Sequence, residues 1–160
     1  MDSIIEDKGL MKAVSFGLNE QLITLMAVMS GFLGYSRKRI ILALIIMSFS
    51  NAIPDAISYY QDNYEETKDR NDSIKQAVFA FMTEMMASVI ILVPIILIKN
   101  THNSIKLSYL FIASILFINL RYLMKYDLSS TSIQMVIYGF VGLCIYYISY
   151  LASKYFDLNV

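Results

Sequence analysis

Two stretches of this chain decide its fold class: "VIILVPIILI" (residues 89–98) and "YLFIASILFINL" (residues 109–120). Both are apolar on every face of a helix, whereas a surface helix of a small soluble bundle keeps a polar face. The whole chain shares this bias, because 57% of its 160 residues are hydrophobic, 16% are charged and the mean hydropathy is +0.55. Soluble domains are about 45–50% apolar and about 25% charged. We therefore expect an integral membrane protein rather than a soluble helical bundle.

Apolar segments of helical length recur along the chain. A bilayer core about 30 Å thick needs about 20 apolar residues in a spanning helix, and no segment shows the alternation typical of barrel strands. The sequence predicts one all-α domain over residues 1–160 with a short polar loop at 61–76. Its five expected transmembrane helices cover residues 13–35, 40–60, 77–98, 107–123 and 133–151. The N-terminus lacks the basic and apolar regions of a cleavable signal peptide, so we expect the first helix to be retained.

The charge balance and the motifs exclude several function classes. The formal net charge is zero, with 13 basic and 13 acidic residues, which argues against a nucleic-acid partner. The predicted topology places seven Lys and Arg residues on the side of the N-terminus and six on the other, so this count does not set an orientation. The single cysteine, Cys144, cannot form an internal disulfide and is expected in an apolar core. Phosphate-binding, zinc-binding and nucleophile motifs are absent, so we expect no enzyme and no permanently bound cofactor.

A stripe on the first predicted helix combines a carboxylate with small side chains. Glu20, Thr24, Ala27, Gly31 and Gly34 follow one another at spacings of four and three residues, which places them on one face. Small residues let helices approach closely in lipid. The stripe is either a helix-packing seam with Glu20 at the headgroups or a carboxylate at the mouth of a closely packed pathway.

The second predicted helix carries hard oxygen ligands at depth. Asn51 and Asp55 share a polar face, and Pro54 beside them leaves the carbonyl oxygen of Ser50 without its helical hydrogen bond. Such oxygens suit divalent cations. A helix end at the membrane surface would explain Asp62, but Asn51 and Asp55 lie a turn or two deeper. We therefore predict metal ligands at both positions and a hinge at Pro54.

The third predicted helix places Glu84 among Met82, Met85 and Met86, with Pro94 further along. An ionisable residue within a span costs about 2.5–3.5 kcal/mol on insertion scales and usually faces a cavity or a partner. Thioether sulfur is a soft ligand that prefers transition metals, although methionine more often fills gaps in a core. We add Glu84 to the predicted metal ligands and Pro94 to the predicted hinges.

The first three segments resemble the vacuolar iron transporter family over roughly residues 15–98. Its first helix typically opens with aspartate, glycine, leucine, an aliphatic residue and threonine, and "EQLITLMAVMSGFLG" (residues 20–34) has that shape. Its second helix carries an asparagine or glutamate and then alanine, aspartate, alanine, isoleucine and serine. Asn51 and "PDAISYY" (residues 54–60) are similar to that motif.

The resemblance implies a homodimer that exchanges ferrous iron, and often manganese, for protons. In a eukaryote it implies a vacuolar-type or other intracellular membrane, and otherwise it leaves the membrane open. It implies a metal path between the first two helices of both subunits, with Glu20, Asn51 and Asp55 at the site. Three departures stand out: Gln21 replaces the glycine, Tyr59 replaces a methionine, and the long acidic insertion before the third helix is missing.

The sequence thus predicts a multi-pass, proton-coupled carrier of Fe²⁺ or Mn²⁺ whose partners are the bilayer, the cation and a second copy of the chain. Carboxylates that bind the cation when ionised release it when protonated, because burial favours the proton and a bound cation favours the charge. The alternatives are a non-transporting scaffold, whose polar stripes hold helices together, and a metal-independent channel.

Overall fold

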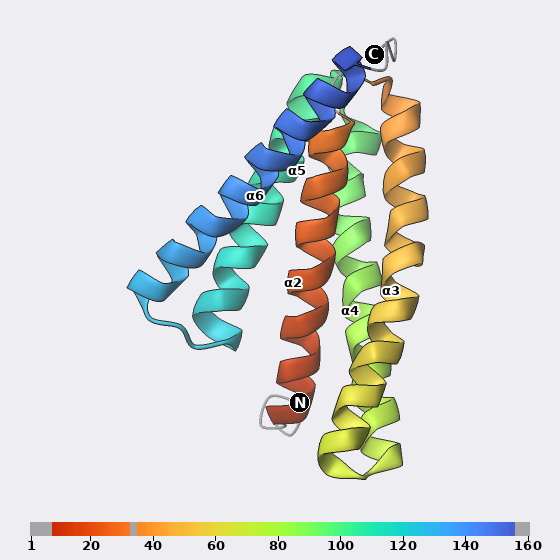
Figure 1. The fold of residues 1–160 in the computed structure, drawn as a ribbon, viewed down its shortest axis with the longest axis vertical. Helices are drawn as coiled ribbons and strands as arrows, with labels where there is room; N and C mark the ends of the chain where they lie inside the picture. Colours follow the sequence, from red (N-terminus) through yellow and green to blue (C-terminus); the bar gives the residue numbers. More distant parts are fainter. Residues whose placement is uncertain (1–7, 33–34, 156–160) are drawn as a thin grey trace.

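The computed structural model describes residues 8–32 and 35–155, and this part of the chain is helical with no strand (Figure 1). It confirms the predicted all-α class, and the described residues form five helices, the fourth ending in a π-helical turn, η1. The elements are α2 (Lys8–Gly31), α3 (Arg37–Thr67), α4 (Arg70–Leu97), α5 (Thr101–Ile118) with η1 (Asn119–Leu123), and α6 (Leu128–Tyr155).

Four of these helices are long and apolar enough to cross a membrane: α3, α4, α5 with η1, and α6. The sequence predicts five such helices, and α2 is not among the four. Three consecutive polar residues, Asn19, Glu20 and Gln21, lower its hydropathy. They are tolerated because α2 lies at the centre of the fold and contacts α3, α4, α5 and α6.

The main hydrophobic core surrounds the second half of α2. Leu22, Leu25 and Met29 are fully buried there, against apolar side chains of the three helices that follow. Those side chains include Ile40 and Leu44 of α3, Ile91 and Ile95 of α4, and Ile112 and Leu116 of α5. By contrast, α6 leaves most of its apolar side chains exposed.

The predicted polar loop at 61–76 is wrong in its extent. α3 continues to Thr67 and α4 begins at Arg70, so only Lys68 and Asp69 connect them. Lys68 adopts the left-handed conformation (φ 57°) that ends a helix, and the Asp69 carboxylate accepts hydrogen bonds from two amides of the next helix. The turn is therefore confined to Lys68 and Asp69, and the polar residues on either side of it are helical.

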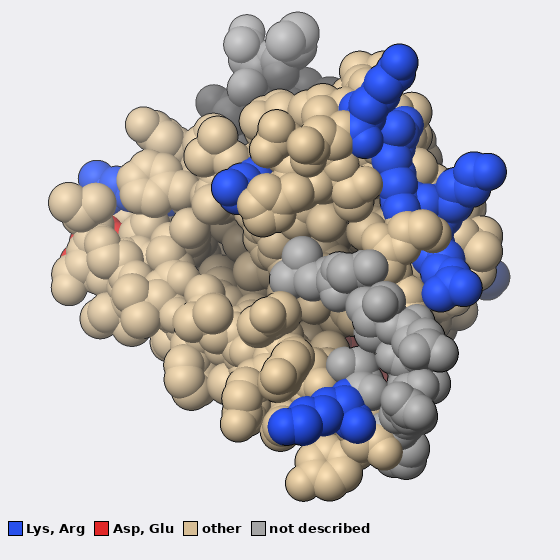
Figure 2. Space-filling view, turned by 90° about the horizontal axis from the view of Figure 1, so that it is seen from above, with Lys and Arg blue, Asp and Glu red and all other residues tan. Residues whose placement is uncertain are grey.

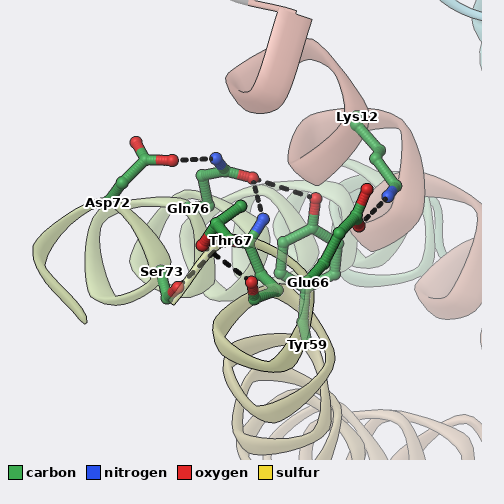
Figure 3. A network of polar contacts seen from close by, with 8 residues as sticks. Lys12, Tyr59, Glu66, Thr67, Asp72, Ser73 and Gln76 are labelled. Carbon is green, nitrogen blue, oxygen red and sulfur yellow. Dashed lines mark hydrogen bonds and ion pairs between the residues drawn. The ribbon is translucent and has the colours of Figure 1, made fainter. Parts of the chain in front are cut away.

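The hairpin of α3 and α4 is longer than a membrane requires. At 1.5 Å per residue, α3 and α4 are about 46 Å and about 42 Å long, against about 30 Å of hydrocarbon. Figure 3 shows the polar network that fixes its tip. Asn63 donates to Gln76 Oε1 at 2.8 Å and accepts from the Ser73 hydroxyl at 2.9 Å, while Gln76 Nε2 donates to Asp72 Oδ2 at 2.6 Å. Every one of these bonds joins side chains within the hairpin.

Side chains and carbonyls also define the ends of the other helices. Asn100 caps α5 by accepting from the amide of Asn103 at 3.1 Å, and Arg37 donates to the carbonyl of Ile96 at the end of α4. Asp127 caps α6, and hydrogen bonds from the hydroxyl and amide of Ser130 hold the pKa of the Asp127 carboxyl below its ordinary value. The hydrogen bond between Asp127 and the Ser130 amide places the start of α6 several residues before residue 133, where the sequence predicts it.

Charge is unevenly distributed between the two ends of the bundle. The end that carries the α2–α3 and α4–α5 connections has basic side chains at Arg37, Lys38, Arg39, Lys99 and Lys106, and no acidic residue lies in the described stretches around them. Figure 2 looks onto this end and shows Lys and Arg side chains with almost no Asp or Glu. The described carboxylates lie in the other half, towards the α3–α4 hairpin.

Candidate cation site

Glu84 is the most unusual polar residue of the fold. It lies on the buried face of α4, its exposed fraction is 0%, and both of its carboxylate oxygens lack a hydrogen-bond partner among the described residues. An ionised carboxylate isolated in an apolar interior is prohibitively costly, so such a group requires a proton or a cation. The sequence predicts Glu84 as a ligand, and its burial gives that prediction a physical basis.

Two further carboxylates act on Glu84. The charges of Asp55 on α3 and Glu20 on α2 both interact with it, and those of Asp55 and Glu20 interact with each other. Asp55 is half-buried and Glu20 is exposed towards a cavity. Acidic side chains of three helices therefore lie within electrostatic range of one another, and a bound cation would favour their charged forms.

Gly17 explains how α2 and α4 approach each other so closely beside Glu84. A β-carbon at this position would lie 2.6 Å from the carbonyl oxygen of Ala80 and 3.2 Å from Cγ of Glu84. Only glycine fits between the two backbones here. The backbone of α2 consequently forms one wall of the space around the Glu84 side chain.

Gln21 connects the same three helices next to the carboxylates. Its Nε2 donates to Ser88 Oγ at 2.7 Å and lies 3.3 Å from Ser48 Oγ, and both hydroxyls donate to carbonyls of their own helices. Gln21 is fully buried, and its Oε1 has no partner in the described part of the chain. This oxygen is a further unsatisfied acceptor one residue from Glu20.

Asn51 is engaged in helix packing. Its Nδ2 donates to Thr24 Oγ1 at 2.8 Å, which leaves its amide oxygen as the possible ligand. Ala27 is half-buried, and a β-carbon at Gly31 would lie 3.2 Å from Ser149 Oγ of α6. The remaining predicted packing residue, Gly34, lies outside the described residues.

The predicted soft ligands and hinges are differently placed. Met82 and Met86 are 53% and 63% exposed, so they point away from the face that carries Glu84. Pro54 is exposed and Pro94 is buried, and the helix continues through each. Tyr59, one turn beyond Asp55, packs its ring 5.0 Å from that of Phe16. Oxygen atoms thus supply the polar surface between the three helices.

No group of three His, Cys, Asp or Glu side chains within residues 8–32 and 35–155 is close enough to hold a metal ion. Glu20, Asp55 and Glu84 are therefore neighbours in electrostatic range rather than a preformed coordination shell. A cation at this position would need carbonyl, amide or water oxygens to complete its ligands.

Sequence reasoning missed Gln21, Ser88 and Gly17 as parts of the site. Gln21 could have been found, because it lies three residues after Leu18 and four before Leu25, on a helix face that supplies apolar core residues. Ser88 follows Glu84 by one turn, a spacing that places both on one face. Gly17 gave no signal of its own, because its role depends on the distance to α4.

Comparison with known proteins adds nothing to this geometry: no protein-family model, no curated protein and no solved structure matches the chain.

Proposed function

We propose that this chain is a multi-pass membrane protein that carries a divalent cation, Fe²⁺ or Mn²⁺, in exchange for protons. The observation that supports the proposal is Glu84, fully buried with both oxygens unpartnered and within range of two more carboxylates. A carboxyl group in that position is unfavourable as a bare anion, so it holds either a proton or a cation. Entry of one divalent cation displaces two protons, and the charge in the site is then conserved.

The roles follow from placement. Glu84 holds the cation at the centre of the bundle, and Asp55 shares it from α3. Glu20 faces the solvent-accessible side of α2 and passes the ion to the buried pair. A homodimer is part of the proposal, since a second copy would supply oxygen ligands that three separated carboxylates of one chain lack.

A flux measurement in reconstituted vesicles tests this proposal. We expect Mn²⁺ uptake, followed with an internal quenched dye, together with proton movement in the opposite direction. Glu84→Gln and Asp55→Asn keep the side-chain shapes and remove the charges, and each should lower the flux at least tenfold. Asp62→Asn, on the exposed surface of α3, is the matched control and should leave it unchanged. Wild-type flux in both site variants would refute the proposal.

A scaffold function has its own supporting observation. The bonds from Gln21 to Ser48 and Ser88, and from Asn51 to Thr24, join helices in the way that polar residues hold membrane bundles together. If packing is the only function, Mn²⁺ leaves the unfolding temperature of the purified chain unchanged. Gln21→Leu then lowers that temperature without any effect on metal.

A further inference from the structure

A cavity of about 550 Å³ is lined by Glu20 but not by Glu84. Its walls are the first half of α2, Tyr59 of α3 and the turn that follows η1. In Figure 1, α5 and α6 diverge from α2 towards this end of the bundle. The volume is within the range of small-molecule sites, about 300–1,000 Å³.

Three lysines line one end of this cavity. Lys8 and Lys12 are one turn apart on α2, and Lys125 follows η1 in the left-handed conformation (φ 57°) that turns the chain towards α6. Lys12 also lies 3.4 Å from Glu66 of the hairpin, in an exposed ion pair that water screens. Segments more than a hundred residues apart thus bring three ammonium groups to one opening.

The rest of the wall is mainly apolar. Phe16, Leu123 and Met124 line it, and Ser15 contributes a buried hydroxyl that has no partner among the described residues. Glu20 lies at the inner end, about 12 Å along α2 from Lys12 at 1.5 Å per residue. The cavity therefore has a basic opening and an apolar body.

We propose that this cavity binds an anionic phospholipid, with the phosphate among Lys8, Lys12 and Lys125 and an acyl chain against Phe16, Leu123 and Met124. Basic pockets between membrane helices bind lipid headgroups for the same reason that these lysines attract phosphate. The lipid would pack against both α2 and η1, which already contact each other through the hydrogen bond from Asn119 to the carbonyl of Ser15. The inference rests on the membrane insertion in the proposed function but not on transport.

Thermal unfolding of the purified full chain in an uncharged detergent tests the inference without any metal. Phosphatidylglycerol should raise the unfolding temperature by several degrees, whereas phosphatidylcholine and inorganic phosphate should not. The triple variant Lys8→Gln, Lys12→Gln, Lys125→Gln should lose this shift. The control Lys38→Gln, Arg39→Gln, Lys99→Gln removes the same charge from exposed positions at the opposite end and should keep it.

Three results would overturn the inference: an equal shift with phosphatidylcholine, an equal shift with inorganic phosphate, or a full phosphatidylglycerol shift in the first triple variant. Native mass spectrometry gives an independent readout, since one phosphatidylglycerol should stay bound to wild type and be lost from that variant. Glu84→Gln should retain the lipid. Failure of the lipid site and failure of the transport proposal are therefore separately visible.

Discussion

Replacement of Glu84 by glutamine isolates the group on which the proposed function depends. The amide has nearly the shape of the carboxyl group, so the packing of α2, α3 and α4 around it is preserved. It cannot be ionised, and it therefore cannot exchange a proton for a cation. We expect Glu84→Gln to remove metal stabilisation while leaving the metal-free fold almost unchanged.

The structure gives the size of both effects. An ionised Glu84 without a cation would cost at least about 2.5–3.5 kcal/mol, so the metal-free protein holds a proton there. Replacement of the protonated carboxyl group by the amide then alters the free energy of unfolding by about 1 kcal/mol. In a chain of this size that changes the unfolding temperature by up to about 4 °C. A cation at a hundred times its Kd contributes about 2.7 kcal/mol, which corresponds to roughly 5–11 °C.

Cys144 provides the readout. The chain has no tryptophan and one cysteine, which is half-buried in α6, so a thiol-reactive dye reports the opening of the bundle on heating. We expect Mn²⁺ to raise the unfolding temperature of wild type by roughly 5–11 °C and to leave that of Glu84→Gln unchanged. The wild-type shift should shrink as the pH falls, because protons compete with the cation for the carboxylates. An undiminished Mn²⁺ shift in Glu84→Gln would show that the cation binds elsewhere.

Three other predictions concern the fold that holds this site. Gly17→Ala should destabilise the protein by about 1–3 kcal/mol, because its β-carbon would collide with the α4 backbone, whereas Gly139→Ala meets open space and should be neutral or stabilising in the same thermal assay. Asn63→Ala should cost about 1–3 kcal/mol by removing the hydrogen bonds of Asn63 to Gln76 and Ser73 at the hairpin tip, and equal melting of Asn63→Ala and the exposed control Asn71→Ala would contradict that network. Asp127→Asn should lower stability at neutral pH and match wild type in strong acid: the lowered pKa of this carboxyl gives stability that is present above its unfolded value of 3.8 and is lost as the pH falls through the folded value.

Local signals in the sequence were sufficient for the helices and insufficient for their ends. Apolar runs of helical length predicted all five helices of the described chain, because the period and polarity of a segment are properties of that segment alone. The hairpin between α3 and α4 was predicted as a loop because its residues are polar. Its helices persist because Asn63, Ser73 and Gln76 form hydrogen bonds with one another across the hairpin. Such pairing cannot be predicted until the two helices are placed side by side.

The sequence by itself determined that this chain is helical, that most of it is apolar enough for a membrane, and that Glu20, Asp55 and Glu84 interrupt that apolar surface. Only the tertiary structure decided which of these polar groups face one another, because that depends on the rotation and spacing of helices rather than on position along the chain. The close contact at Gly17 brings α4 against α2 and seals Glu84 from water. The same packing turns Met82 and Met86 outward. It also brings Lys8, Lys12 and Lys125, from two distant segments, to one cavity.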